Sequence, residues 1–170
     1  MKKKSNQSLA VQTKMVLPSD TNPLNTLFGG RLLAWMDEIA SISAHRHCGR
    51  VVVTASINNV SFDKPILAGE IVTLEAKVSR AFSSSMEVFV DVHVEQSNGE
   101  KEKCNEAIYV FVAIDQNRNP IEVPGLIPET TEEKERFESA LRRKQLSLVL
   151  AGRMKPEDAN ELKAALFPKQ

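Results

Sequence analysis

The stretch between Gly29 and Gly49 constrains the fold of this chain more than any other feature. Its apolar and small residues recur at helical spacing, and further ones widen the stripe to most of the circumference. They are Leu32, Leu33, Ala34, Met36, Ile39, Ala40, Ser41, Ser43 and Ala44. A helix that is apolar nearly all round has to be buried, so the rest of the chain must wrap around it. We expect it to run to about Arg46 and to stop near Gly49, because glycine is favoured just past a helix C-terminus.

Four runs rich in Val, Ile, Phe or Thr follow this helix, over residues 51–62, 70–79, 86–95 and 106–114. Turn residues join them, which predicts an antiparallel meander. A mixed segment over residues 9–17 is predicted as a further strand before the helix. The expected fold class is α+β, with one long central helix wrapped by an antiparallel sheet.

The C-terminal part of the chain has a different character. Prolines 120, 124 and 128 predict an extended strap, and a charged helix is expected over residues 129–150. Pro156 opens a short last helix, since proline is favoured in the first turn. We therefore divide the chain into a domain over residues 1–128 and a helical extension over residues 129–170.

Composition excludes several functions. The chain has 170 residues, 42% of them hydrophobic, and its 22 basic residues balance 22 acidic ones, so no net charge attracts nucleic acid. The apolar stretch at residues 9–11 is too short for a signal peptide, and nothing approaches the ~18 apolar residues of a membrane span. Cys48 and Cys104 are far apart, which argues against a zinc site or a disulfide framework. We expect a cytoplasmic protein with no metal, no nucleic-acid partner and no membrane partner.

Asp37 is an unusual residue in the predicted central helix. It lies on the same face as Leu33, Ala40 and Ala44. Burying an ionised carboxylate costs several kcal/mol unless it is paired, so such a residue is often retained for function. A narrow wet edge shared with Glu38 is the structural alternative, and the pattern alone leaves both open.

Glycines and asparagines precede Asp37. Gly29 and Gly30 open the helix, where a ligand can approach free backbone N–H groups at the positive end of the helix dipole. A glycine pair is equally consistent with tight packing. Asn22 and Asn25 flank a Pro-Leu pair, and asparagine is also a common turn residue.

The connection over residues 79–85 carries Arg80, Ser83, Ser84 and Ser85. A guanidinium and several hydroxyls can hold a phosphate, although a solvated hairpin tip has the same composition. His45 and His47 point to different faces of the helix, which is poor metal geometry, so we interpret both as helix C-terminal cations. His93 is expected on a wet strand face. No nucleophile elbow is recognisable around any serine.

Taken together, these pieces resemble the hotdog-fold acyl-CoA thioesterases, particularly the cytosolic acyl-CoA hydrolase branch. The resemblance covers residues 15–146 and is carried by residues 19–22, 27–30, 35–38, 46–48, 53–56, 82–87, 123–124 and 126–130. It implies a dimer built by joining two sheets, commonly arranged as a trimer of dimers. It also implies hydrolysis of acyl-CoA to fatty acid and CoA without a separate cofactor, because CoA is part of the substrate.

The resemblance assigns roles to individual residues. Asp37 matches the catalytic aspartate, as base or nucleophile, and Asn22 lies fifteen residues upstream of it, the spacing of the family's pair. Asn25 stands where relatives often have glycine, so either asparagine is a candidate. The backbone N–H groups of Gly29 and Gly30 would polarise the thioester carbonyl. Thr54 and the Arg80 loop, with Ser83, Ser84 and Ser85, would bind substrate.

Helix geometry adds a constraint of its own. Gly30 and Asp37 are seven positions apart, which places their backbones roughly 10 Å apart at about 1.5 Å per residue. One carbonyl carbon cannot contact both groups, because catalytic groups act within about 3 Å of the reacting atoms. The N–H donors and the carboxylate are therefore expected to come from two helices, hence from two subunits.

Two other functions compete with thioester hydrolysis. A hotdog dehydratase acting on hydroxyacyl thioesters would use a catalytic histidine with a carboxylate, and the three histidines lie outside the predicted pocket. A non-catalytic acyl-CoA-binding regulator would bind product tightly without turnover. An aspartate on the buried helix face favours the hydrolase over the regulator.

Overall fold

In a computed structural model, described here over residues 1–168, the chain divides into two compact units. The first is Met1–Ile127 and the second begins at Pro128. No helix within residues 1–168 is long and apolar enough to cross a membrane.

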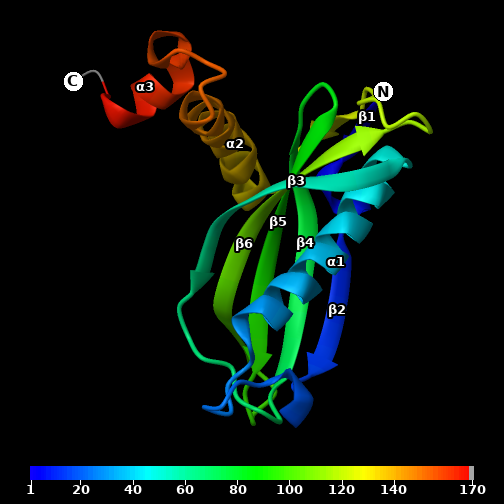
Figure 1. The fold of residues 1–170 in the computed structure, drawn as a ribbon, viewed down its shortest axis with the longest axis vertical. Coiled ribbons are helices and arrows are strands. Elements are labelled where there is room, and N and C mark those ends of the chain that lie inside the picture. The colour runs from blue at the N-terminus through cyan, green and yellow to red at the C-terminus, as the bar shows by residue number, and fades with distance from the viewer. Residues whose placement is uncertain (169–170) are drawn as a thin grey trace. The chain divides into compact units, whose positions relative to one another are not determined.

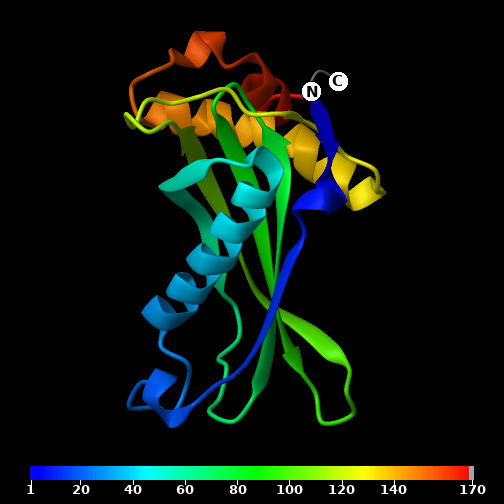
Figure 2. The same ribbon diagram turned by 90° about the vertical axis from the view of Figure 1, so that its right-hand side faces the viewer.

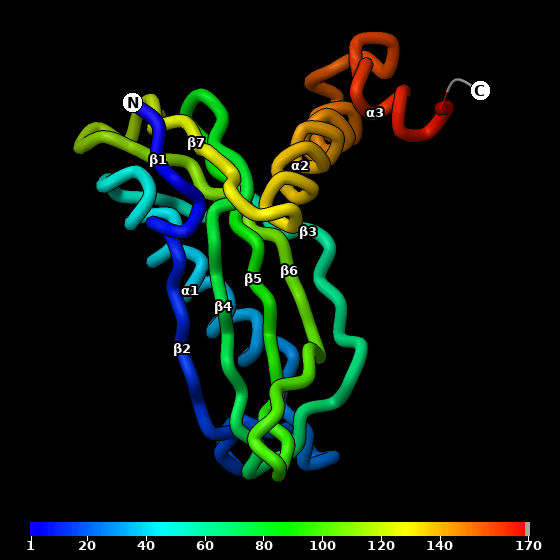
Figure 3. Tube along the Cα trace, turned by 180° about the vertical axis from the view of Figure 1, so that it is seen from behind, coloured from blue at the N-terminus to red at the C-terminus, as the bar shows by residue number. Residues whose placement is uncertain are grey.

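One long helix and a five-stranded antiparallel sheet make up most of the first unit (Figure 1). The helix is α1 (Gly29–Cys48), and the sheet has the order β2-β4-β5-β6-β3. The strands are β2 (Ala10–Met15), β3 (Val51–Phe62), β4 (Ile71–Ala81), β5 (Ser85–Glu95) and β6 (Lys101–Ile114). Figure 2 shows α1 running diagonally along the strands. Figure 3 gives the reverse view, in which the sheet lies in front of α1. The predicted α+β plan of a central helix against an antiparallel sheet is confirmed.

The burial of α1 follows its sequence pattern. Its side chains at Leu32, Met36, Ile39, Ala40 and Ala44 are at most 3% exposed. The helix ends where it was predicted to end: Gly49 has a φ of 66° and its N–H donates to the His45 carbonyl. Glycine adopts this left-handed conformation without the penalty that a Cβ imposes.

The predicted meander is wrong in one respect, the position of β3. Strands β4, β5 and β6 do follow one another, but β3 pairs with β6 at the far edge of the sheet instead of with β4. Strands β4 and β5 are apolar along most of their inward positions and occupy the centre. Strand β3 carries polar residues and two register shifts, at Thr54/Ser56 and Asn58/Ser61. Such a strand is better suited to an edge, where irregular pairing is tolerated.

A small parallel pair, β1 (Lys2–Lys4) with β7 (Gly125–Ile127), was not predicted from the sequence. Three residues each are too short to show a period. Two hydrogen bonds also join the start of the chain to β4. The buried Ser5 hydroxyl donates to the Val78 carbonyl, and the Ser8 hydroxyl accepts from the Val78 N–H. The predicted proline strap thus becomes a short strand.

The second unit contains α2 (Thr131–Leu150), the short 3₁₀ turn η3 (Pro156–Asp158) and α3 (Asn160–Leu166). Helix α2 begins two residues later than predicted, because Thr130 and Glu133 form a capping box. The Leu162 N–H donates to Gln145 Oε1 at 2.9 Å and joins α3 to α2. Residues 169 and 170 of the expected extension lie outside the described residues.

Candidate active site

Asp37 lies in the third turn of α1, on the flank that faces strand β3. Its Oδ1 accepts a hydrogen bond of 2.8 Å from the Thr54 hydroxyl. The side chain is half-buried instead of enclosed, which corrects the expectation that it sits on a fully buried helix face. The reason is the edge position of β3, which leaves this side of α1 open. The carboxylate is therefore held at one oxygen by Thr54 and is not enclosed by the rest of the chain.

Between its polar residues, the edge strand beside Asp37 exposes several large apolar side chains. Val51 is 65% exposed, Val53 44%, Ile57 42% and Phe62 53%. An edge strand also presents unpaired backbone N–H and C=O groups along its outer side. This combination is typical of an edge that another polypeptide covers.

Tyr109 supports the turn that carries Asp37, and sequence reasoning missed it. Its hydroxyl donates to the Leu33 carbonyl at 2.9 Å, one helical turn before Asp37. Burial raises the pKa of this phenol, and the nearby charge of Asp37 raises it further, so the hydroxyl keeps its proton. The signal was available, because a tyrosine in an otherwise apolar strand needs a hydrogen-bond partner for its hydroxyl.

The N-terminus of α1 presents two backbone donors. The N–H groups of Arg31 and Leu32 both turn back to the Phe28 carbonyl, but within residues 1–168 the Gly29 and Gly30 N–H groups have no acceptor. A Cβ on Gly30 would lie 3.3 Å from the Phe28 ring, so glycine keeps this approach open. Two hollows, of about 340 and 320 Å³, are lined by Gly30 and Gly29 respectively. A bound carbonyl oxygen can accept hydrogen bonds here.

Asn22 organises the loop that precedes these donors. Its Oδ1 accepts from the N–H groups of Leu24, at 2.9 Å, and Thr26, at 3.2 Å, while its amide donates to the Thr26 hydroxyl. None of these contacts involves Asp37. Asn25 has a φ of 58°, a left-handed conformation that asparagine and glycine tolerate best. Asn25 therefore has a conformational reason to be there that needs no catalytic role.

The prediction for the Arg80 loop needs correction. Ser79, Arg80 and Ala81 belong to β4 and Ser85 begins β5, so the turn itself is residues 82–84. The carbonyls of Ser83 and Ser84 accept from the N–H groups of Val123 and Ala113. A hairpin that is tied down this way is shorter and more rigid than a solvated loop.

Arg80 lies on the face of the sheet opposite to α1. It is paired in register with Glu87, which is paired with Val110, whereas the neighbouring Tyr109 points to α1. Directly opposed residues share a face, and successive residues alternate. The Arg80 guanidinium stands over the Phe82 ring at 5.6 Å. Within one copy, Arg80 and Asp37 are therefore on different faces.

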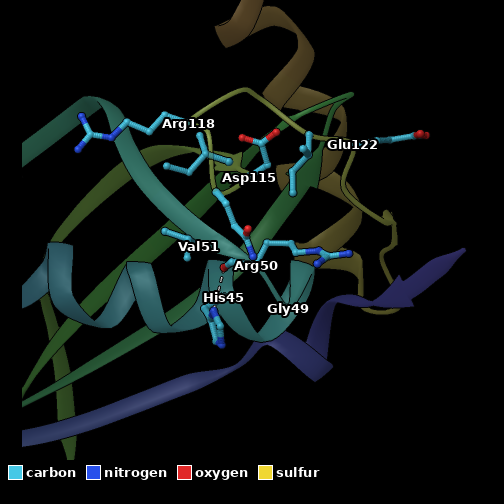
Figure 4. Close-up of a pocket in the computed structure, with 10 residues that line it drawn as sticks. His45, Gly49, Arg50, Val51, Asp115, Arg118 and Glu122 are labelled. Atoms are coloured by element: carbon cyan, nitrogen blue, oxygen red, sulfur yellow. Dashed lines mark hydrogen bonds between the residues drawn. The ribbon is translucent and has the colours of Figure 1, made fainter.

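A larger hollow than these two, about 810 Å³, lies at the opposite end of α1 (Figure 4). One of its polar groups closes a local turn: Asp115 accepts from the N–H groups of Asn119 and Asn117, which hold the pKa of this carboxyl below its usual value. The His45 ring bonds the Arg50 carbonyl at 2.8 Å. Size alone does not make this the reactive site, and the Asp115 carboxylate is committed to its own turn.

The histidines are only partly as predicted. His47 is fully buried, with Nε2 bonded to the Pro124 carbonyl at 2.7 Å, and burial lowers its pKa. It is a neutral link between α1 and the proline strap, not a helix C-terminal cation. His93 is half-buried instead of lying on a wet strand face. Within residues 1–168, no three His, Cys, Asp or Glu residues gather as metal ligands.

Comparison with known proteins identifies the fold and the class. Residues 24–101 match the Thioesterase superfamily. A Staphylococcus aureus acyl-CoA hydrolase, solved with butyryl-CoA and CoA, superposes with a TM-score of 0.84 at 38% identity, over 96% of this chain and 99% of that one. A hexameric acyl-CoA thioesterase superposes with a TM-score of 0.85 at 39% identity, over 89% of this chain and 97% of that one. The molecule is thus a hotdog-fold protein of the thioesterase superfamily.

Sequence relatives narrow the family further. An uncharacterized acyl-CoA thioester hydrolase of Bacillus subtilis is 50% identical over 128 residues, which are 75% of this chain and 74% of that protein. The human cytosolic acyl coenzyme A thioester hydrolase is 34% identical over 73% of this chain. The chain spans only about a third of that human protein's length. This chain belongs to the acyl-CoA thioester hydrolase family, as its resemblance to that family predicted.

Proposed function

We propose that this chain hydrolyses acyl-CoA thioesters with Asp37 as its reactive carboxylate. The observation that carries the assignment is the Thr54–Asp37 hydrogen bond at the open edge of the sheet. Structures of the Staphylococcus aureus hydrolase were determined for alanine variants of an aspartate, a threonine and an asparagine. The spacings there are fifteen residues from asparagine to aspartate and seventeen from aspartate to threonine. Asn22, Asp37 and Thr54 have the same spacings here, which supports the assignment.

The chemistry follows from two groups, the Asp37 carboxylate and the backbone N–H donors at the start of α1. Thr54 occupies one carboxylate oxygen of Asp37, so the other is free to take a proton from a water molecule. That water attacks the thioester carbonyl carbon, and the backbone N–H groups of Gly29 and Gly30 stabilise the oxyanion that develops. Collapse of the tetrahedral intermediate breaks the C–S bond, and the proton held by Asp37 passes to the departing sulfur, so that CoA and the free acid are released and the carboxylate is restored. This route uses water and substrate alone, with no metal or separate cofactor.

A second copy of the chain brings the carboxylate and the N–H donors together. Antiparallel pairing of two β3 strands about a twofold axis near the strand's middle sets the Phe62 end of one beside the Thr54 half of the other. A Cβ on Gly29 would lie 3.5 Å from the Phe62 ring, so the helix N-terminus travels with that end. The N–H donors of one copy then approach Asp37 of the other. Hexameric thioesterases among the structural relatives support a trimer of such dimers.

The remaining substrate contacts are assigned from their positions. Arg80, on the outer face of the sheet, is suited to bind a CoA phosphate at a site shared with another dimer, with Ser83, Ser84 and Ser85 beside it. Asn22 holds the loop before Gly29 and orients the thioester. We place the activity in the cytosol, as supported by cytosolic hydrolases among the relatives.

A panel of acyl-CoA substrates from C2 to C18, with released thiol as the readout, tests this function. We expect turnover by the wild-type chain and its loss in Asp37→Asn, with the fold unchanged by circular dichroism. Tight binding of acyl-CoA without thiol release by the wild type would favour a regulator instead. Consumption of a hydroxyacyl-CoA without thiol release would favour a dehydratase.

A further inference from the structure

A buried asparagine lies in the core near the N-terminal end of α1, where an apolar residue would be expected. Asn105 is on β6 and shares the inward-facing row with Ala107, Tyr109 and Phe111. It is only 2% exposed, and within residues 1–168 its Oδ1 has no hydrogen-bond partner. Its amide donates to the Cys104 sulfur, at 3.4 Å. An unsatisfied buried acceptor of this kind costs about 1–3 kcal/mol and calls for an explanation.

The same asparagine lines the hollow of about 320 Å³ beneath the first turn of α1. The hollow's walls include the apolar side chains of Leu27, Leu32, Phe62 and Ile66, and Gly29 lies at its rim. Lys64, also on the rim, is already paired with Glu102. A molecule that enters past Gly29 therefore meets mostly hydrocarbon and one unpaired polar atom.

We propose that this hollow takes the acyl group of the substrate and that Asn105 accepts a hydrogen bond from a hydroxyl on a short acyl chain. The inference rests on the proposed hydrolase function, in which the Gly29 N–H binds the thioester oxygen. The carbons attached to that carbonyl then enter the adjacent hollow, and the large polar CoA arm has to leave towards solvent. The hollow is at the small end of the range for ligand pockets, which suits a short chain.

A plain alkyl chain would leave the Asn105 oxygen buried and unpaired. A site that contains a buried hydrogen-bonding group discriminates against the analogue that lacks the matching group. The hydroxyacyl thioester is therefore preferred over the alkyl thioester of equal length. Asn105→Leu, which keeps the shape and removes the polar atoms, removes that preference.

The test compares kcat/KM for butanoyl-CoA with that for 3-hydroxybutanoyl-CoA and 4-hydroxybutanoyl-CoA. For the wild type we expect one of the hydroxylated substrates to be preferred about tenfold, the factor that one hydrogen bond to a buried group provides. In Asn105→Leu this ratio should fall to about one, chiefly because butanoyl-CoA improves. Because each ratio is taken on one protein preparation, partial unfolding of the variant does not change it.

Ser43→Ala is the matched control, since Ser43 is also fully buried and its hydroxyl has no partner in the described part of the chain, but it does not line the hollow. It should leave the ratio unchanged. A wild type that prefers butanoyl-CoA overturns the inference, even if Asn105→Leu does not fold. An equal rise in KM for all three substrates in Asn105→Leu also overturns it, because Asn105 would then contact the CoA arm. Failure of the wild type to hydrolyse any of them refutes the hydrolase function itself.

Discussion

At the scale of single residues, Asp37 is expected to decide turnover. Asp37→Asn keeps the volume and can still accept a hydrogen bond from Thr54, but it cannot take a proton from water. Loss of a general base costs about 10²- to 10⁴-fold in rate, so kcat should fall by that factor while acyl-CoA still binds. Steady-state kinetics with calorimetric binding checks this. A folded variant that retains more than a tenth of wild-type kcat would contradict the role.

Tyr109 is the residue whose part in positioning Asp37 is open to test. Tyr109→Phe removes the hydrogen bond to the Leu33 carbonyl and leaves the ring in place. A net loss of about 1 kcal/mol in unfolding free energy is expected, as for a typical intramolecular hydrogen bond. We expect kcat to fall several-fold at unchanged KM, because the turn that bears Asp37 loosens. Denaturant unfolding and kinetics on one preparation measure both, and an unchanged kcat would make Tyr109 purely structural.

Arg80 is expected to bind without taking part in the chemistry. Because a phosphate contact is made equally in the ground and transition states, Arg80→Ala should raise KM several-fold with little change in kcat. Phe82→Leu is a useful companion, since it removes the ring under the guanidinium and keeps the charge. A collapse of kcat at saturating substrate would show that Arg80 acts on the reacting atoms.

At the scale of elements, the helix and strands that have a clear periodicity were predicted from the sequence. The pairing of strands that lie far apart in the sequence was not. The all-round apolar pattern placed α1 and its end at Gly49, and residues 51–62 were predicted as a strand with the bounds that β3 has. The partner of β3 was mispredicted, because neither its period nor its turns carry information on which strand it meets. For the same reason, Asn105 was overlooked, because its importance comes from what faces it across the core.

The link between α1 and the proline strap should respond to pH. His47 has a lowered pKa in the folded chain, and on unfolding it returns towards 6.5. Below about pH 6.5 the unfolded chain therefore binds a proton that the folded chain resists. As the pH is lowered from there, the unfolding free energy decreases until the pH passes the folded pKa of His47. Lys3 opposes protonation, and the Pro124 carbonyl favours it.

Melting temperatures between pH 5 and 8 provide the measurement. In His47→Gln, whose amide can still donate to the Pro124 carbonyl, the part of the decline that His47 causes should disappear. His45→Gln serves as the control, because His45 is exposed and lies two residues away in the same last turn of α1. Equal pH dependence in the wild type and His47→Gln would show that this histidine does not limit stability in acid.

At the scale of the whole molecule, the exposed edge of β3 is expected to be the interface that completes the active site. Ile57 is 42% exposed in one copy and lies near the middle of the strand, close to where a twofold axis would pass. In Ile57→Asp the two introduced carboxylates would face each other across that axis, and like charges directly opposed in a sheet are destabilising. Each copy should still fold, since the side chain is not part of its core, but assembly and turnover should be lost together. Light scattering and thiol release on the same sample measure both.

Val11→Asp is the matched control, because Val11 is 52% exposed on β2, the opposite edge of the sheet. A monodisperse single copy of Ile57→Asp with full activity would show that one chain holds a complete site.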